Sequence, residues 1–251
     1  MFGCGVVSVS FRQLSVDEVI RYTKEAGLSL IEWGSDVHAP YNDKERLEYI
    51  ARAQAEAGIS CPSYGTYFKL GVDDVETLHG YAEAARILGT KILRLWCGNK
   101  NYTELTAEER DFMISECKKA AKIAEEEGVT LCMECHQKSF TNVLEGALDL
   151  MRSVDSKAFR MYWQPSTKEG VEYNLEYARG IKDYVDTIHV FYYKDGKKAY
   201  LSEGTEEWKR YLAEFDGRQN LLLEFMPDGS PESLKGEAAA LNALAEEARK
   251  R

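Results

Sequence analysis

The sequence predicts a single (β/α)₈ barrel that spans residues 1–251, and three observations predict it. The chain has 251 residues, about the length of one such barrel. Strand-like runs alternate with amphipathic helical patterns, which implies parallel strands joined by crossover helices. An open, doubly wound sheet is the alternative. A dinucleotide-binding sheet would carry G-x-G-x-x-G after its first strand, but Gly3-Cys4-Gly5 lies at the start of that strand without the third glycine.

The first half of the chain contains four strand–helix units. The strands are expected at 3–10, 29–34, 59–65 and 91–98. The first helix is expected to begin near Ser15, and the next three to cover 43–57, 73–88 and 107–127. Several helices end on a glycine just before the next strand, where glycine suits a left-handed cap. These glycines are Gly27, Gly58, Gly89 and Gly128.

The second half continues the alternation. Its strands are expected at 129–135, 159–164, 187–193 and 220–226, and its helices at 142–153, 172–180, 205–215 and from 231 to the end. The irregular segment KDGKKAYLSEG at 194–204 is long enough to cover a site as a lid. It also suits a plain surface hairpin, and the sequence leaves both open.

Charge and hydropathy exclude several classes of function. With a net charge of −10, the chain lacks the clustered basic residues that bind nucleic acids or anionic membranes. No apolar run approaches a membrane span, and the N-terminus has no signal-peptide pattern. Six cysteines do not suggest a secreted disulfide scaffold, so we expect a cytoplasmic protein, with a homo-oligomer left open. Cys132 and Cys135 form a C-x-x-C inside a strand-like run, where odd spacing disfavours a shared metal or redox role.

A polar residue ends each of the last four apolar strand runs. The four are Glu134 in LCMEC, Gln164 in MYWQP, His189 in TIHVF and Glu224 in LLLEF. Successive positions are 30, 25 and 35 residues apart, close to the average of about 31 residues per strand–helix unit. Because barrel active sites gather at the C-terminal ends of the strands, we expect these side chains to converge.

The types of these residues indicate a divalent cation. Three oxygen donors and one imidazole suit Mn²⁺, Mg²⁺ or Co²⁺, and also Zn²⁺. A single histidine or glutamate at a strand end is more often a hydrogen-bonded structural residue. The joint pattern therefore predicts a metal site made by Glu134, Gln164, His189 and Glu224.

These four positions resemble the metal site of the xylose isomerase-like superfamily of sugar isomerases and epimerases. The resemblance covers nearly the whole chain, through IEWGSDVHAP, SYGTYF, LRLWCG, ECHQ, YWQPS, IHVFYY and LLEFMPDG. These segments resemble a subgroup of sugar phosphate isomerase/epimerase proteins. The resemblance implies metal-dependent isomerisation or epimerisation of a small sugar, polyol or sugar phosphate, by proton abstraction next to a polarised carbonyl. Glu134 and Glu224 would be both ligands and the acid/base pair, working through an enediolate.

The chain departs from the family pattern at the second ligand. Better-known members usually have an aspartate there, and this chain has Gln164. A glutamine ligates through its amide oxygen but brings no negative charge, so we expect weaker metal binding and a stronger Lewis acid. The alternative is that Gln164 binds substrate and leaves three protein ligands.

Further residues near the strand ends are candidate substrate contacts. His136, two residues past Glu134, would point to the same face of an extended chain, and His38 lies in the loop after the second strand. Aromatic residues near strand ends would stack on a sugar ring or pack in the core; they are Trp33, Tyr64, Trp96 and Trp163. Arg94 and Lys69 could reach an anionic group, but ion pairs are favoured for both.

Two other functions remain open, and a third is disfavoured. A metal-dependent dehydratase of a keto-inositol or related keto-polyol uses the same proton abstraction, followed by loss of a β-hydroxyl. The superfamily's abasic-site endonucleases need more histidines than the four present here and a basic DNA face. A non-catalytic barrel would bind sugar without turnover. No glycine-rich phosphate cradle is evident, which favours an unphosphorylated substrate.

Overall fold

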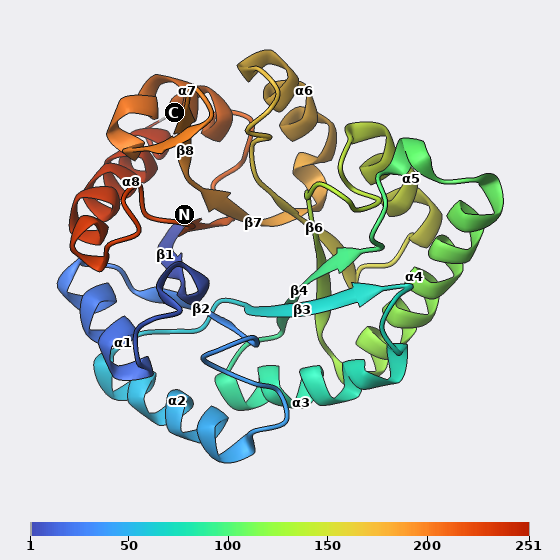
Figure 1. Ribbon diagram of the computed structural model, residues 1–251, viewed down its shortest axis with the longest axis horizontal. Helices are drawn as coiled ribbons and strands as arrows, with labels where there is room; N and C mark the ends of the chain where they lie inside the picture. The colour runs from blue at the N-terminus through green and yellow to red at the C-terminus, as the bar shows by residue number, and fades with distance from the viewer. Residues whose placement is uncertain (1, 251) are drawn as a thin grey trace.

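In a computed structural model that describes residues 2–250, eight parallel strands form a closed barrel inside a ring of eight helices (Figure 1). The strands follow one another around the barrel in chain order, and the last closes onto the first. They are β1 (Gly3–Val7), β2 (Leu30–Gly34), β3 (Tyr64–Leu70), β4 (Ile92–Cys97), β5 (Thr130–Glu134), β6 (Phe159–Trp163), β7 (Val185–Val190) and β10 (Asn220–Leu223). The predicted (β/α)₈ barrel is confirmed.

The helices pack around the outside of the strands. They are α1 (Val16–Glu25), α2 (Lys44–Ala57), α3 (Leu78–Leu88), α4 (Ala107–Glu127), α5 (Leu144–Val154), α6 (Val171–Ile181), α7 (Thr205–Leu212) and α8 (Leu234–Ala248). Ser15 and Thr106 begin α1 and α4 with capping boxes, in which a glutamate three residues later completes the hydrogen bonds. All four glycines expected to follow helices have positive φ, as predicted.

The third strand begins later than the sequence predicts. We expected it at 59–65, whereas β3 covers Tyr64–Leu70. Pro62 lies inside the expected strand and has no N–H to donate to a neighbouring strand. An isolated bridge between Ser60 and Leu30 joins this earlier segment to the sheet. The regular pairing with β4 therefore starts only after the proline.

Three strands end earlier than expected. β1, β7 and β10 finish at Val7, Val190 and Leu223, each three residues before its predicted end. Side chains take over the hydrogen bonding at the barrel mouth. Ser8 Oγ accepts from the Gly34 amide at 2.9 Å, and Ser10 Oγ accepts from the Phe225 amide at 2.9 Å. Both contacts lie where the loops of the site begin.

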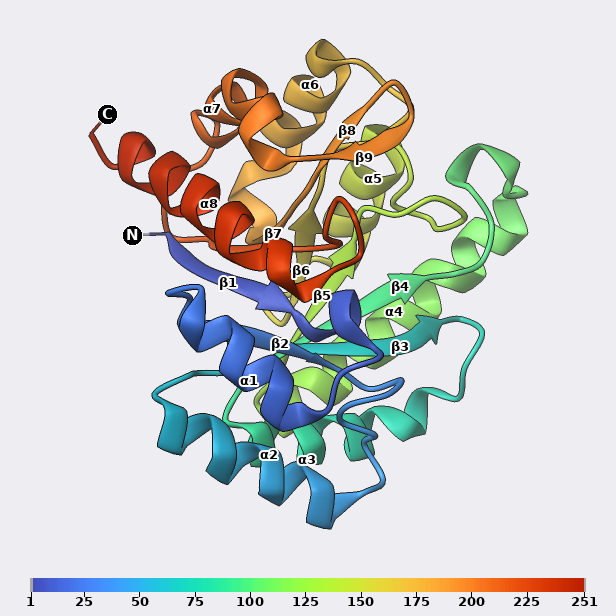
Figure 2. The same cartoon turned by 60° about the vertical axis from the view of Figure 1, so that its left-hand side comes forward.

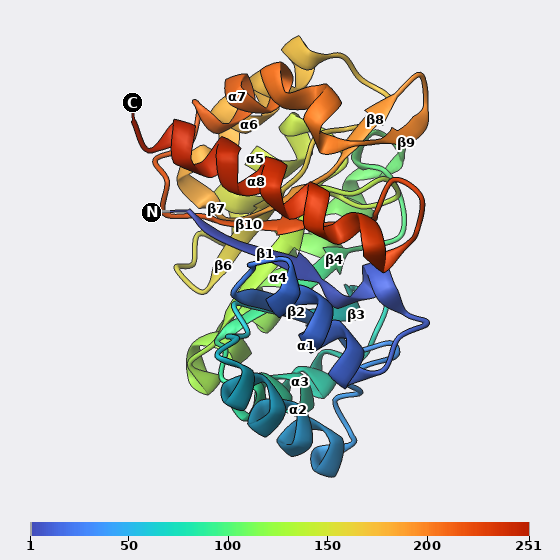
Figure 3. The same ribbon diagram turned by 90° about the vertical axis from the view of Figure 1, so that its left-hand side faces the viewer.

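Part of the irregular segment 194–204 forms a hairpin above the barrel (Figure 2). Its strands are β8 (Tyr192–Lys194) and β9 (Lys197–Ala199). Asp195 and Gly196 both have positive φ, as a two-residue hairpin turn requires. The hairpin lies at the end where the barrel strands finish, whereas the chain enters and leaves at the opposite end (Figure 3).

Most of the apolar core lies between the strands and the helices. Trp163, 1% exposed, packs from β6 against Trp208 and Tyr211 of α7, with ring centroids 6.1 and 5.4 Å away. A smaller apolar cluster consists of Val7, Val9 and Leu222, with Leu30 and Tyr67 packed against it. Among the described helices, none is long and apolar enough to cross a membrane.

The rest of the barrel interior is polar. Glu32 of β2 accepts a hydrogen bond from Tyr162 Oη of β6 at 2.8 Å, although β2 and β6 are not neighbours in the barrel. This contact therefore crosses the interior. Gly65 leaves room for the cluster, because a Cβ there would lie 2.8 Å from Glu32 Oε1 and 2.9 Å from Arg94 Nη2. Charged groups are thus built into the barrel beneath its mouth.

Candidate functional site

The four predicted metal ligands come together at the C-terminal end of the barrel. His189 lies at the centre of the group. Its Nδ1 atom is 3.6 Å from Glu134 Oε1 and 3.7 Å from Glu224 Oε2. The same nitrogen is 3.2 Å from Gln164 Oε1. Residues that are far apart in the sequence therefore meet at one point.

The spacing of these atoms fits a metal ion. The candidate ligand atoms of Glu134, His189 and Glu224 all lie within 4.8 Å of one another. Metal–ligand bonds of about 2.0–2.2 Å place neighbouring donor atoms roughly 3.0–3.6 Å apart. The distances from His189 Nδ1 fall within this range or just beyond it. A small inward movement of the side chains would complete the coordination.

The charge balance also fits a divalent ion. Three carboxylates and one guanidinium are buried around His189; they belong to Glu32, Glu134, Glu224 and Arg94. With a neutral imidazole, the cluster keeps two uncompensated negative charges. Uncompensated charges are costly in a buried cluster, and a divalent cation would balance these two.

The same charges shift the pKa values of the site. Burial alone would lower the pKa of His189, but the nearby carboxylates, Glu224 foremost, raise it to about 10. Burial opposes ionisation of Glu134, yet Arg94 and His189 hold its pKa well below the usual range. Burial raises the pKa of Glu224, with attraction from His189 opposing and repulsion from Glu134 adding to the shift. The two predicted catalytic glutamates are therefore electrostatically unequal.

Glu32 holds the far side of the His189 ring. Its Oε1 atom is 3.7 Å from His189 Nε2, while its Oε2 atom accepts hydrogen bonds from Ser63 and Tyr162, both at 2.8 Å. In the described chain, neither Glu32 Oε1 nor His189 Nε2 has a hydrogen bond of normal geometry. A proton on Nε2 would face Oε1. A carboxylate in this position orients a metal-binding histidine and leaves Nδ1 for the ion.

Gln164 has a fixed orientation. Its Nε2 atom donates to the carbonyl of Cys135 at 3.0 Å, which directs Oε1 toward His189 Nδ1. When His189 carries its proton on Nε2, two acceptor atoms face each other across 3.2 Å. A cation beside both atoms would stabilise this arrangement, so the orientation of Gln164 suits ligation.

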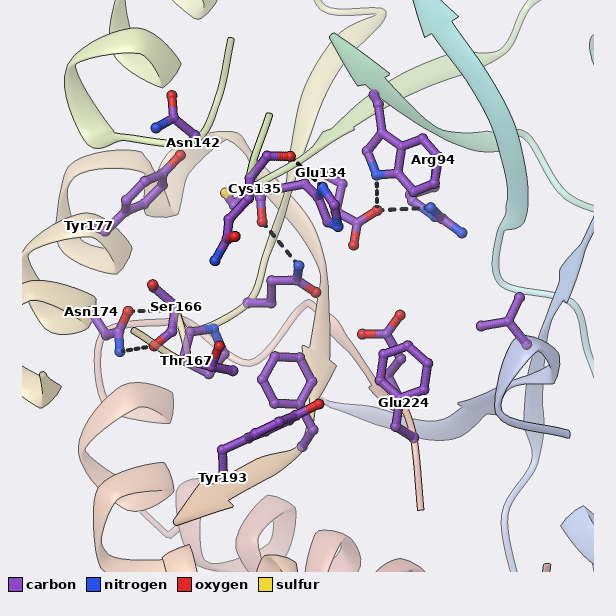
Figure 4. Close-up of a pocket in the computed structure, with 18 of the residues that line it drawn as sticks. Arg94, Glu134, Cys135, Asn142, Ser166, Thr167, Asn174, Tyr177, Tyr193 and Glu224 are labelled. Atoms are coloured by element: carbon purple, nitrogen blue, oxygen red, sulfur yellow. Dashed lines mark hydrogen bonds and ion pairs between the residues drawn. The ribbon is translucent and has the colours of Figure 1, made fainter. Parts of the chain in front are cut away.

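Glu134 is held on one side by two donors. Its Oε2 atom accepts from Arg94 Nη1 at 2.8 Å and from Trp96 Nε1 at 2.6 Å (Figure 4). Arg94 also lies 3.4 Å from Glu32 Oε1 through its Nε atom. The guanidinium therefore bridges two carboxylates, and Glu134 is left with Oε1 to offer to an ion.

A cavity of about 370 Å³ opens above this cluster. Gln164, Glu134 and Glu224 are among the residues that line it. His136 and Trp96 form part of its wall, with ring centroids 5.3 Å apart. The cavity gives a small ligand direct access to the candidate metal ligands.

The sequence profile of the xylose isomerase-like TIM barrel family matches residues 20–216. The chain belongs to this family. No curated protein matches the chain. The resemblance inferred from the strand-end residues is therefore confirmed at the level of the family.

Solved structures of other proteins share the fold. The probable 3-DHS dehydratase AsbF from Bacillus anthracis, involved in petrobactin synthesis, has a TM-score of 0.80 at 16% identity, covering 96% of this chain and 99% of that one. An L-ribulose 3-epimerase has a TM-score of 0.76 at 17% identity, covering 100% and 96%. A xylose isomerase-like TIM barrel protein from Mycobacterium smegmatis, in complex with magnesium, has a TM-score of 0.74 at 13% identity, covering 99% and 98%. At these identities the likeness shows the fold.

In this xylose isomerase-like barrel, four predicted substrate contacts lie away from the cavity. They are His38, Trp33, Tyr64 and Trp163, all at most 1% exposed. Trp33 Nε1 donates to Gln54 at 2.8 Å, and His38 Nε2 lies 3.0 Å from the carbonyl of Leu14. The structure places all four in the core, and we do not retain them as substrate contacts.

Strand alternation explains which aromatic residues reach the cavity. Successive side chains on a strand point to opposite faces. Trp33 follows the inward-facing Glu32, and Trp163 precedes Gln164, so both tryptophans face the helices. Trp96 lies two residues from Arg94 and shares its inward face. Once the inward face is known, the inward polar residues Glu32, Arg94 and Gln164 show which of these tryptophans reach the cavity.

The structure adds residues that the sequence reasoning missed. Glu32 was not singled out, although a carboxylate inside the apolar run LIEWG is itself a signal of a buried polar cluster. At the cavity rim, Arg12 contacts Asp36 at 2.6 Å and Tyr67 Oη at 2.5 Å. Arg94 forms the predicted ion pair, but inside the barrel.

The cysteines of C-x-x-C have separate surroundings. Both are free thiols in the described structure. Cys132 Sγ contacts Asp186, whereas Cys135 Sγ contacts the carbonyl of Tyr162. Burial raises the pKa of both thiols, that of Cys135 to about 12. Neither cysteine has the low thiol pKa of a redox or metal-binding pair.

Proposed function

We propose that this chain is a divalent-metal-dependent enzyme that isomerises or epimerises a small sugar or polyol by moving a proton next to its carbonyl. The observation that carries the proposal is the convergence of two carboxylates, an imidazole and an amide oxygen beneath a cavity of about 370 Å³. Mn, Co, Mg or Zn would be held by Glu134, Gln164, His189 and Glu224. When bound there, such an ion supplies Lewis acidity that lowers the pKa of a C–H bond beside the substrate carbonyl.

Glu224 is the residue best placed to move the proton. Its side chain is 10% exposed and lines the cavity. Within residues 2–250, no donor forms a hydrogen bond of normal geometry with its carboxylate. The pKa of Glu224 is raised toward neutral pH, and a carboxylate with a higher pKa is a stronger base.

Glu134 has a more restricted role. The family resemblance implies that it is the second member of an acid/base pair. Arg94 and Trp96 occupy its Oε2 atom, and Oε1 faces His189. Glu134 therefore serves first as a fixed anionic ligand, and proton transfer by it requires one of these contacts to loosen. Trp96 and His136 would contact the substrate from the cavity wall.

A dehydratase of a keto-polyol is the second candidate, and the unequal glutamates favour it. Epimerisation at one carbon needs a proton-transfer group on each face. Removal of a proton and loss of a hydroxyl from the same side need only one such group, which Glu224 could supply. The likeness in fold to the probable 3-DHS dehydratase AsbF, with a TM-score of 0.80, supports this candidate.

Metal content and proton exchange together test the proposal. The protein, purified without a metal column, is analysed by elemental mass spectrometry and incubated in D₂O with a panel of ketoses and inososes. We expect about one bound divalent ion per chain and deuterium in the recovered sugar. A product of unchanged heavy-atom composition indicates an isomerase or epimerase, and loss of water indicates the dehydratase. Sugar binding without exchange would contradict both and leave a non-catalytic barrel.

A further inference from the structure

The cavity has two chemically different ends (Figure 4). Glu134, Glu224 and Arg94 make one end charged. The opposite end, which we call the distal lobe, is lined by Asn142, Ser166, Thr167, Asn174 and Tyr177, and Tyr193 lies between this end and Glu224. No side chain of the distal lobe carries a charge at neutral pH. Amides, hydroxyls and aromatic rings are the groups that this end offers a ligand.

The distal lobe is held in shape by hydrogen bonds to the backbone. Asn174 Oδ1 accepts from the Ser166 amide at 2.7 Å, and Asn174 Nδ2 donates to the Ser166 carbonyl at 3.1 Å. Asn142 Oδ1 accepts from the Tyr102 amide at 2.8 Å. Asn142 Nδ2 and the Thr167 hydroxyl have no hydrogen-bond partner among the described residues. These two groups are available to hydrogen-bond a ligand, and the hydrogen bonds above hold the surrounding wall in place.

A second cavity of about 160 Å³ continues from the distal lobe. The two cavities share Ser166, Thr167, Asn174 and Tyr193 as lining residues. A ligand that extends past the distal lobe therefore has space to continue between α6, β8 and α7. The site therefore has room for a substrate that extends beyond its reacting carbons.

The surroundings of this second cavity disfavour an anion. The charged side chains that line it are Glu169 and Glu207. The amino end of α6, which would otherwise suit a phosphate, also carries Glu172 in its first turn. Phosphate sites use arginine, lysine or backbone amides free of competing carboxylates. An uncharged, hydroxyl-bearing group meets no such repulsion.

We propose that the distal lobe is a subsite for an uncharged, hydroxyl-rich extension of the substrate, such as a glycosyl unit, and that it discriminates against a phosphate in that position. The amide of Asn142 and the hydroxyl of Thr167 would donate to or accept from sugar hydroxyls. The ring of Tyr193 would pack on the apolar face of the sugar. This inference rests on the proposed function, because it takes the reacting carbons to lie at Glu134 and Glu224.

Binding to the metal-loaded protein tests the subsite independently of turnover. Calorimetry compares three ketoses: fructose, fructose 6-phosphate and the neutral disaccharide lactulose. We expect lactulose to bind about tenfold more tightly than fructose 6-phosphate. This factor is the scale expected when one ligand makes a polar contact and the other leaves the same buried group without a partner. Tyr193→Ala should weaken lactulose binding more than fructose binding.

A charge placed in the distal lobe should reverse the preference. Thr167 is exposed, so Thr167→Lys is compatible with folding. It should strengthen fructose 6-phosphate binding about tenfold through a charge-assisted contact and weaken lactulose binding. Thr103→Lys adds the same charge at an exposed position that does not line the cavity, and it should change neither affinity.

Two results would overturn the subsite. One is wild-type protein that binds fructose 6-phosphate as tightly as lactulose. The other is an unchanged order of affinities in both Thr167→Lys and Tyr193→Ala. By contrast, absence of proton exchange with every sugar, with the expected order of binding intact, would overturn the proposed function and leave the subsite supported.

Discussion

At the scale of single residues, Glu134 and Glu224 share a cluster but not an environment. Arg94 and Trp96 bind one oxygen of Glu134, while Glu224 lines the cavity with its carboxylate free of such donors in the described structure. One glutamate is therefore held by two donors, whereas the carboxylate of the other faces the cavity. Under the proposed function, this difference would give the two residues separable roles.

We expect Glu224→Gln and Glu134→Gln each to abolish turnover, because both positions hold the site together. They should differ in metal content. Glu224→Gln retains the fixed half of the site and should keep a measurable share of its ion, whereas Glu134→Gln loses a carboxylate and leaves Arg94 without that partner. Metal analysis and deuterium exchange on both variants check this. Near-normal exchange in Glu224→Gln would remove Glu224 from the proton-transfer role.

Gln164 allows a gain-of-function test. Gln164→Asp adds a negative charge at a position 3.2 Å from His189 Nδ1, so it should tighten metal binding about tenfold or more. Titration of the metal-free protein with Mn²⁺ measures the change. Gln164→Asn is the control, because it shortens the side chain in the same way without adding a charge. If Gln164→Asp binds Mn²⁺ no better than the wild type, Gln164 lies outside the coordination shell.

At the scale of elements, the barrel interior depends on a glycine in β3. A Cβ at Gly65 would press on Glu32 and Arg94, at 2.8 and 2.9 Å from their nearest atoms. Neither side chain can move aside without disturbing its ion pairs in the buried charged cluster. Gly65 pairs with Gly34 of β2 and Arg94 of β4, and this register places it beside the cluster.

Gly65→Ala should lower the free energy of unfolding by about 1–3 kcal/mol, the usual cost of overpacking a filled interior. Urea denaturation followed by circular dichroism measures it. Gly236→Ala is the matched control, since Gly236 is exposed on α8 with nothing within 4 Å of the added carbon. That variant should be stabilised by roughly 0.5–1 kcal/mol. Equal effects of the two substitutions would show that the interior tolerates a larger side chain.

At the scale of the whole molecule, the buried charges would link the proposed metal binding to proton release. With no cation, the carboxylates raise the pKa of His189 to about 10, so the imidazole is protonated at neutral pH. An ion needs the neutral imidazole and must displace that proton. Metal affinity should therefore rise with pH, by about tenfold per pH unit while His189 remains mostly protonated. Calorimetry in buffers of different ionisation enthalpy should detect about one proton released per ion; affinity independent of pH would contradict the assignment.

Metal binding should also stabilise the fold, because the proposed ion would join residues in or just after β5, β6, β7 and β10. An ion present at 100 times its dissociation constant would add about 2.7 kcal/mol. Removing it with a chelator should lower Tm, and adding Mn²⁺ back should restore it. Glu134→Gln should respond less in the same thermal scan. An unchanged Tm on chelation would mean that no ion bridges these strands.

The sequence by itself determined the barrel, most element positions and the four residues that meet at its mouth. Its repeated strand–helix pattern carried that information, since Glu134, Gln164, His189 and Glu224 each occur once per unit at the same end of a strand. Only the tertiary structure decided which residues surround and support these four. The strands of a parallel barrel are buried on both faces, so hydrophobicity does not show which face points inward. The roles of Glu32 and Arg94, and the placement of Trp33 and Trp163 against the helices, depend on that choice, which contacts across the barrel fix.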